Sequence, residues 1–348
     1  MKILFVGHHM PHYLHTNVYR EKAIRELGHE LIFFDDRKFI LPGRIRDRVG
    51  ILQKWDFYQL NKKLLNIAKL EKPHLCLVMG TRLTLPSVES LRQMRELNAK
   101  LVIWITDSPH DAPYYDSFPL IRATAPFYDH IFCAGTEAID ILKNDGIIHT
   151  SWLTFGCDPD YHRPMLITDR DKKKYGCDIA FVGAYYPERW QILKEIKEYD
   201  LGIWGPSWGK LAEQANNNIH IKDANIDVSE WVKIYNAAKI VIVIHFHGGK
   251  SPCHQVSPKI YEALACGAFV LVDSQKDIFS VFENNKHLVI FDSIEDLKKK
   301  IAHYLQHPAE RRKISECGRQ EVLARHTYRH RMVEIIETVS QQRRELRA

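Results

Sequence analysis

Short apolar runs alternate with amphipathic segments along almost the whole chain. The runs are mostly four or five residues long, which suits a buried strand, and they start afresh after a charged stretch at residues 168–174. Between the runs, apolar residues lie three and four positions apart, a spacing typical of helices. Strands that alternate with helices predict repeated βα units and parallel sheets, and therefore an α/β fold.

Ten strands and the helices between them follow from this pattern. The predicted strands are 2–6, 31–34, 75–79, 101–105 and 130–133 before the charged stretch, and 178–182, 201–204, 240–244, 269–272 and 288–291 after it. Helices are predicted at 17–27, 52–70, 87–97 and 136–144, and a last amphipathic helix at 326–346. The chain has 348 residues, whereas one ordinary domain has roughly 100 to 200. We expect two doubly wound domains joined by a charged linker near residue 170, with a ligand site in the cleft between them.

Composition narrows the class of protein. Hydrophobic residues make up 45% and charged residues 26%, proportions that exclude a disordered or fibrous chain. The N-terminal apolar run is too short for a signal peptide or a membrane span, so we expect a cytoplasmic protein. The seven cysteines are scattered with no CxxC pair, which argues against a disulfide framework and a zinc ribbon.

The net charge suggests an anionic partner without identifying it. A formal charge of +6 suits a nucleotide, a membrane surface or nucleic acid. Basic residues gather after the second predicted strand, namely Arg37, Lys38, Arg44, Arg46, Arg48 and Lys54. Two interpretations of this stretch stay open: a solvated loop, or a site for an anionic polymer, a lipid head group or DNA.

One predicted helix start in the second half carries paired charges. Ser257 is a typical N-cap residue, Pro258 suits the first helical position, and Gly267 ends the helix. Lys259 and Glu262 are three residues apart, so they share a face near the helix N-terminus. A cation beside free backbone N–H groups suits a phosphate, and a carboxylate one turn later can accept two hydrogen bonds from a ribose diol. The alternative is an ordinary surface ion pair.

A second turn between a strand and a helix also carries residues that suit a diphosphate. The strand 178–182 ends at Gly183, and a predicted helix follows that carries Arg189 in its first turn. A glycine lets a ligand approach the backbone closely, and an arginine can hold a diphosphate with two parallel hydrogen bonds. A glycine at the end of a strand is also common for purely structural reasons.

Several ordered motifs together resemble one known family. They are residues 181–183 (FVG) with Arg189 six residues later, the helix 259–267, Gly318 followed by residues 326–331 (HTYRHR), residues 106–110 (TDSPH) and residues 155–164 (FGCDPDYHRP). This set is similar to the signature of the CgeB-like glycosyltransferases, which have the GT-B architecture. The resemblance is densest between residues 152 and 331.

The resemblance implies a fold and a donor site. It implies an N-terminal Rossmann-like acceptor-side domain over residues 1–165, a C-terminal nucleotide-sugar domain over 175–325, and a final helix over 326–348 that packs back on the N-terminal domain. Arg189 and Lys259 match the positions that meet the diphosphate, and Glu262 matches the glutamate that binds the ribose. We expect Gly183, Ser257 and His245 to line the same site. Lys259 stands where relatives usually have arginine.

The chemistry of sugar transfer points to further residues. Departure of the diphosphate builds negative charge that fixed cations stabilise, so we expect no metal and no cofactor besides the nucleotide-sugar substrate, a UDP-sugar being favoured. An acceptor hydroxyl attacking with inversion would also need a general base. Asp107 and His110 are the leading candidates, although residues 107–109 also suit a structural turn. Related retaining enzymes carry a second glutamate where this chain has His254, a third candidate, so the stereochemical outcome stays open.

Other chemistries are weaker matches. Two histidine-rich clusters have no standard zinc spacing, and no metal site is predicted at either: His8, His9, His12 and His15, and His245, His247, Cys253 and His254. No GxGxxG follows any strand, which disfavours a dinucleotide oxidoreductase. We therefore expect a glycosyltransferase whose hydroxyl acceptor is a glycan, a protein, a small molecule or a modified DNA base, with nucleic acid entering only as acceptor. The alternatives are an epimerase-like GT-B enzyme and an inactive protein that binds sugar nucleotides.

Overall fold

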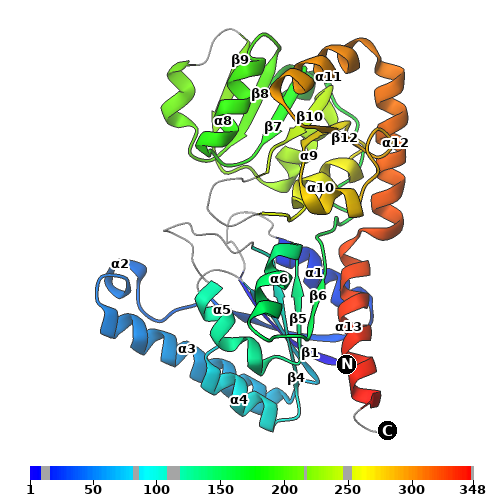
Figure 1. Cartoon of the computed structure of the whole chain (residues 1–348). Coiled ribbons are helices and arrows are strands. Elements are labelled where there is room, and N and C mark those ends of the chain that lie inside the picture. The colour runs from blue at the N-terminus through cyan, green and yellow to red at the C-terminus, as the bar shows by residue number, and fades with distance from the viewer. Residues whose placement is uncertain (9–15, 81–85, 108–117, 215–217, 246–252, 346–348) are drawn as a thin grey trace.

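The computed structural model describes residues 1–8, 16–80, 86–107, 118–214, 218–245 and 253–345. Two six-stranded sheets organise the described chain, and every strand pair in both sheets is parallel. Helices surround each sheet, as Figure 1 shows. The predicted α/β fold with two doubly wound sheets is therefore confirmed.

The first sheet has the strand order β2-β1-β3-β4-β5-β6. Its strands are β1 (Lys2–Gly7), β2 (Glu30–Asp35), β3 (Leu75–Gly80), β4 (Lys100–Ile105), β5 (His130–Cys133) and β6 (Thr150–Trp152). The helices of this half are α1 (Thr16–Glu26), α2 (Gly43–Arg46), α3 (Gly50–Glu71), α4 (Val88–Glu96), α5 (Phe118–Thr124) and α6 (Thr136–Asn144), with the short 3-10 turn η1 (Ala125–Phe127).

The second sheet has the order β12-β11-β10-β7-β8-β9. Its strands are β7 (Ile179–Val182), β8 (Leu201–Gly205), β9 (Ile219–Asp223), β10 (Ile240–Val243), β11 (Val270–Asp273) and β12 (Val289–Phe291). The helices are α7 (Asp169–Tyr175), α8 (Pro187–Leu193), α9 (Val228–Ala237), α10 (Pro258–Ala265), α11 (Ile294–Gln306), α12 (Pro308–Arg325) and α13 (Tyr328–Glu345), with 3-10 turns η2 (Lys194–Ile196), η3 (Gly209–Gln214) and η4 (Lys276–Ser280). This is the strand order of the dinucleotide-binding Rossmann fold.

Both faces of each sheet are buried. Along β4, Leu101, Ile103 and Ile105 pack into the apolar cluster on one face, whereas Val102 and Trp104 pack into the cluster on the other. Parallel strands covered on both sides are apolar at every position, because alternate side chains meet different layers of helices. This explains why the central strands appear in the sequence as unbroken apolar runs.

The last helix returns to the first half, as the family resemblance implied. Tyr328, Met332, Ile335 and Val339 of α13 are fully buried and belong to the same apolar cluster as Ile3 and other residues of the first sheet. Their spacing of four, three and four residues places them on one face of the helix. Figure 1 shows α12 on the second half and α13 running down the first.

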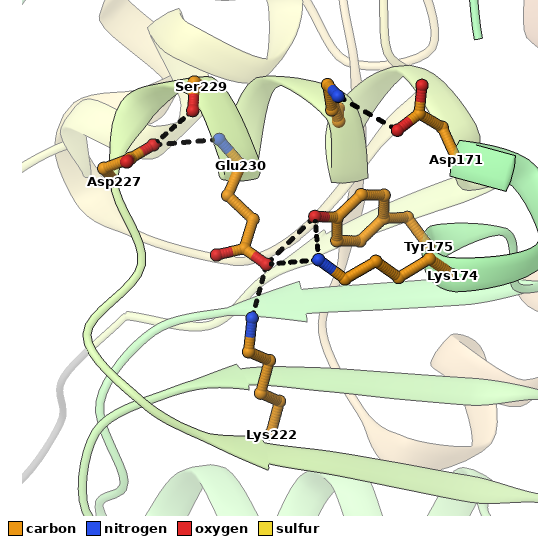
Figure 2. Close-up of polar contacts among 8 residues, drawn as sticks. Asp171, Lys174, Tyr175, Lys222, Asp227, Ser229 and Glu230 are labelled. Atoms are coloured by element: carbon orange, nitrogen blue, oxygen red, sulfur yellow. Dashed lines mark hydrogen bonds and ion pairs between the residues drawn. The ribbon is translucent and has the colours of Figure 1, made fainter. Parts of the chain in front are cut away.

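The charged stretch near residue 170 is a fixed helix, which differs from the predicted linker. Thr168 caps α7, since its side chain accepts a hydrogen bond from the backbone N–H of Asp171. The end of α7 is held by Glu230 of α9, whose carboxylate accepts from Tyr175 Oη at 3.0 Å and Lys174 Nζ at 3.3 Å, and also from Lys222 of β9 (Figure 2). This network fastens α7 to the second sheet.

No helix in the described part of the chain is long and apolar enough to cross a membrane. The seven cysteines, all among the described residues, are free thiols.

Candidate functional site

The strand order of the second sheet places a crevice between β7 and β10. These strands are neighbours, and the chain leaves them in opposite directions: β7 leads to β8 towards one edge of the sheet, and β10 leads to β11 towards the other. Ligands of doubly wound sheets bind outside the carboxyl ends of the strands at such a switch point. Gly183 directly follows β7, and His245 lies just beyond β10, so two predicted donor-site residues lie at this crevice.

Arg189 ties the two strand ends together. It lies in the first turn of α8, and its Nε donates to the backbone oxygen of Ile244 at 3.1 Å while Nη1 donates to that of Ala184 at 2.9 Å. Within the described residues Nη2 takes part in no hydrogen bond. The guanidinium carbon lies 4.7 Å from the centre of the Tyr186 ring. Burial lowers the pKa of Arg189, but an arginine remains charged.

Lys259 reaches the end of β7 from the start of α10. A Cβ atom built on Gly183 would lie 2.7 Å from Lys259 Nζ, so the ammonium group occupies the space that the missing side chain leaves open. No described residue forms a hydrogen bond or an ion pair with Nζ. Burial first, and then the charge of Arg189, lowers the pKa of Lys259 to about 7, while the charge of Glu262 opposes this shift.

Glu262 lies one turn further along α10. It is 7% exposed, and its carboxylate has no hydrogen-bond partner among the described residues. Burial raises the pKa of its carboxyl group to about 7, against the opposing charge of Lys259. Lys259 therefore interacts electrostatically with both Arg189 and Glu262, and this one ammonium group links the three predicted residues.

A histidine and an aspartate set the position of α10. The His245 ring links the Asp273 carboxylate to the start of α10. Its Nδ1 donates to Asp273 Oδ1 at 2.6 Å, and its Nε2 accepts from the backbone N–H of Ser257 at 3.1 Å. The Ser257 side chain itself makes no capping hydrogen bond. Because both ring nitrogens of His245 are occupied, we infer that it positions the start of α10 and does not use a ring nitrogen to bind the donor.

Two residues, Trp208 and Gly205, contact the backbone carbonyl of Gly183. Trp208 is fully buried, and its indole N–H donates to the Gly183 carbonyl at 2.8 Å. Gly205 has a φ of +150°, and a Cβ there would lie 2.1 Å from the same carbonyl oxygen. The sequence did not point to either contact, because each joins residues more than twenty positions apart.

The facing edge of the first sheet carries Asp107 and a buried arginine. Asp107 lies two residues beyond the end of β4, and its charge interacts with that of Arg20 in α1. Arg20 is 2% exposed; its Nη1 donates to Asn17 Oδ1 at 2.7 Å, and its Nε and Nη2 have no partner in the described residues. The sequence analysis missed Arg20. His110, the other predicted base, lies outside the described residues.

His254 joins the two halves of the chain. Thr136, at the start of α6, donates from its backbone N–H to Asp277 Oδ2 at 2.8 Å and from its hydroxyl to Asp277 Oδ1 at 2.6 Å. The hydroxyl has one proton, so it must accept at its 3.1 Å contact with His254 Nδ1. His254 is therefore protonated on Nδ1, and Nε2 has no partner in the described part of the chain. Glu137 Oε2 lies 3.9 Å from Nδ1.

No group of three His, Cys, Asp or Glu side chains among the described residues is arranged to hold a metal ion. Of the two histidine-rich clusters, residues 9–15 and 246–252 lie outside the described residues.

Comparisons with known proteins show a likeness in sequence and in fold. Residues 175–337 match a family described as glycosyl transferase-like. The spore protein CgeB of Bacillus subtilis (strain 168) is 27% identical over 250 residues, an alignment covering 65% of this chain and 71% of that protein.

Solved structures share the whole architecture. Sucrose-phosphate synthase from Thermosynechococcus elongatus has a TM-score of 0.70 at 14% identity, with 98% of each chain covered. Anabaena HepE, in complex with UDP and glucose, has a TM-score of 0.64 at 13% identity, covering 98% of this chain and all of that one (100%). An alpha-glucosyltransferase in complex with UDP-glucose and DNA has a TM-score of 0.62 at 12% identity, covering 97% and 99%. At these identities the likeness shows the fold alone. The chain is thus similar to CgeB, as its motifs indicated; residues 175–337 match the glycosyl transferase-like family, and the chain has a GT-B fold.

Proposed function

We propose that the chain is a glycosyltransferase that uses a UDP-sugar as donor and a hydroxyl group as acceptor. The observation that carries this proposal is the pair Lys259 and Glu262: Glu262 is buried, Lys259 is half-buried, and no described residue hydrogen-bonds either charged group. A buried polar group without a hydrogen-bond partner is unfavourable, so the pair is suited to a ligand that brings anionic oxygens and hydroxyl groups.

The ligand that fits these groups is a nucleoside diphosphate. Lys259 and the free Nη2 of Arg189 provide cations at the end of β7, and the first turn of α10 adds its helix dipole. Glu262, one turn away, can accept hydrogen bonds from both hydroxyls of a ribose. The complexes of HepE with UDP and of the alpha-glucosyltransferase with UDP-glucose support uridine as the base.

The reaction needs a charge stabiliser and a proton acceptor. The bond from the sugar C1 to the diphosphate oxygen breaks with its electron pair on the diphosphate, and Lys259 and Arg189 stabilise that charge without a metal. The acceptor oxygen bonds to C1 and loses its proton to a base. Asp107 and the unpartnered Nε2 of His254 are the candidates among the described residues. The configuration of the product at C1 decides whether the reaction retains or inverts.

We further propose that residues 1–165 bind the acceptor and residues 175–325 the donor. The donor residues all follow strands or begin helices of the second sheet, whereas Asp107 follows a strand of the first.

A thermal-shift screen against UDP, GDP, dTDP, CDP and their sugars tests the donor site. A ligand that binds the folded state raises the melting temperature, so we expect UDP to give the largest shift. Arg189→Ala, Lys259→Gln and Glu262→Gln are expected to abolish that shift. Lys313→Gln and Glu316→Gln are matched controls, because these residues have the same i, i+3 spacing on the exposed face of α12. A UDP shift that survives in all three site variants would refute the assignment.

Donor turnover separates this function from the alternatives. An epimerase-like enzyme would convert the UDP-sugar with no acceptor present. An inactive binding protein, which the replacement of glutamate by His254 favours, would show the thermal shift but neither transfer nor hydrolysis.

A further inference from the structure

Exposed apolar side chains and basic charge gather on one tip of the first half. Six of the large hydrophobic residues that are exposed in the described chain lie between positions 40 and 58, namely Ile40, Ile45, Val49, Ile51, Trp55 and Tyr58. Residues 37–66 contain eight Lys and Arg and two Asp. This segment therefore carries a net charge of +6, as much as the whole chain, and the remaining residues are balanced. We call the segment from Arg37 to Asn66 the basic-apolar tip.

The apolar residues form a face that no described residue covers. In α3, Ile51, Trp55 and Tyr58 are spaced by four and three residues, so they share one side of the helix. They are 75%, 45% and 61% exposed. The opposite side buries Leu60 and Leu64 in the core. The helix thus has two apolar sides, and the fold of the chain covers one of them. Figure 1 shows α2 and the start of α3 at the outer edge of the molecule.

The basic residues stand beside this face and most are free of ion pairs. Arg44, Arg48 and Lys54 are exposed, and neither acid of the tip pairs with them: Asp47 binds Arg46, and the Asp56 carboxylate is buried, accepting from the N–H of Ile40. A hollow of about 620 Å³ of open space lies alongside, lined by Lys38, Lys62 and Lys63 together with Asp56 and four uncharged residues. Its three lysines against one buried aspartate give the hollow a positive charge, which suits an anionic head group.

We propose that the basic-apolar tip binds the surface of a membrane that contains anionic lipids. Aliphatic and aromatic side chains interleaved with Arg and Lys allow apolar burial at the acyl boundary and attraction to lipid phosphates at the same time. Nucleic acid would use the charges but would leave Ile45, Ile51 and Trp55 in water. A second copy of the chain would bring one +6 tip against another, so like charges oppose that contact. The inference goes beyond glycosyl transfer and does not depend on it.

Cosedimentation with vesicles tests the proposal. We expect the protein to sediment with vesicles of equal parts phosphatidylglycerol and phosphatidylcholine, to dissociate as salt is added, and to stay in solution with phosphatidylcholine alone. The triple variant Arg44→Gln/Arg48→Gln/Lys54→Gln should bind roughly a hundredfold more weakly, because each basic residue contributes about 1 kcal/mol near an anionic surface. The variant Ile51→Ser/Trp55→Ser/Tyr58→Ser should also lose binding.

The matched control removes the same charge elsewhere. Arg170→Gln/Lys172→Gln/Lys173→Gln changes three exposed residues of α7 and should bind vesicles like the unmodified protein. An unchanged melting temperature in the absence of ligand shows that each variant folds. Failure to sediment with anionic vesicles would overturn the proposal, as would an equal loss in the control. Duplex DNA binding that survives the apolar substitutions, or a dimer that they dissociate, in the absence of vesicle binding, would assign the tip to those partners instead.

Discussion

Lys259 makes donor binding depend on pH. Its pKa is lowered to about 7 by burial and by Arg189, so the empty site loses its ammonium charge as the pH rises through neutrality. A diphosphate binds the protonated form, and affinity should therefore be highest below the pKa and fall above it, by up to about tenfold per pH unit. Calorimetric titration with UDP between about pH 7 and about pH 9 measures this decline.

Lys259→Arg is the control for this alkaline decline. Arginine stays protonated over the whole range, so the variant should bind UDP with an affinity that changes little above neutrality. Glu262 acts in the opposite direction: burial raises its pKa to about 7, and its ability to accept from two hydroxyls is lost as the pH falls. An identical alkaline decline in Lys259→Arg would contradict the assignment of the titrating group.

UDP binding is expected to require a glycine at position 183, because a larger residue would fill the space that the Lys259 ammonium group occupies. Its backbone φ lies outside the left-handed region, so the restriction is steric: an added Cβ would lie 2.7 Å from Lys259 Nζ and 3.0 Å from a ring carbon of Phe181. Gly183→Ala should displace the ammonium group and weaken UDP binding by roughly tenfold or more, about the effect of one lost charge-assisted hydrogen bond. Gly50→Ala, where nothing lies within 4 Å, is the matched substitution and should bind UDP normally.

At the scale of elements, the ten predicted strands are present to within one or two residues at each end, whereas two strands were missed. β6 and β9 each lie at one edge of their sheet, and their sequences TSW and IHIKD mix polar with apolar residues. An edge strand is packed on fewer sides than a central one, so it does not require a continuous apolar run. The other two edge strands, β2 and β12, have such a run and were predicted.

In the candidate site, too, some residues could be predicted from local sequence patterns and others could not. Arg189, Lys259 and Glu262 were predictable because each lies near a helix start that Pro and polar capping residues mark in the sequence. Asp273 could also have been noticed, as an acid that directly follows a buried strand. The contacts of Thr136 with Asp277 could not, because they join residues 141 positions apart, and local patterns carry no information about such pairs.

The contact between α6 and η4 is expected to support transfer more than donor binding. Thr136→Val removes the hydroxyl that donates to Asp277 and accepts from His254, and should cost about 1 kcal/mol of stability. Because this hydroxyl joins the two halves and orients His254, the variant should lower kcat for transfer severalfold while the Kd for UDP stays the same. Thr168→Val removes a similar capping hydroxyl within one half. An equal loss of kcat in that control would show a general effect of stability.

For the molecule as a whole, the two halves are joined by a short buried junction. Residues 157 and 327 pair as an isolated bridge, so the chain passes between the sheets twice at one place. Arg331 of α13 is buried there and donates from Nε to the Phe155 carbonyl at 2.8 Å. From α1, Lys22 forms an ion pair with Asp158 at 3.0 Å. The family motif at residues 155–164 thus lies at this junction between the two halves.

His162 is the titratable centre of this junction and makes the stability of the fold sensitive to acid. The side chain is 0% exposed, its Nδ1 accepts from the Asp158 N–H at 3.0 Å, and its ring packs edge-on against Tyr19 at 5.0 Å. Burial lowers the pKa of His162 to about 3, whereas an unfolded histidine titrates near 6.5. The unfolded state therefore binds a proton first, and stability that is present above about pH 6.5 is lost as the pH falls.

His162→Asn isolates this contribution, because the asparagine oxygen can still accept from the Asp158 N–H but does not titrate. Between about pH 7 and about pH 5, the unmodified protein should lose about 2 kcal/mol more unfolding free energy than the variant, as measured by urea denaturation. Other buried histidines, such as His326, contribute equally to the pH dependence of the unfolding free energy in both proteins. The relevant quantity is therefore the difference between the two proteins in the slope of unfolding free energy against pH. His220→Asn removes an exposed histidine of β9 whose Nε2 lies 3.3 Å from Asp200 Oδ1; an exposed pair contributes little to stability, so this variant should change the pH dependence far less than His162→Asn. Equal slopes for His162→Asn and the unmodified protein would mean that the junction opens to solvent before the rest of the chain unfolds, since a histidine that becomes hydrated early no longer links protonation to global unfolding.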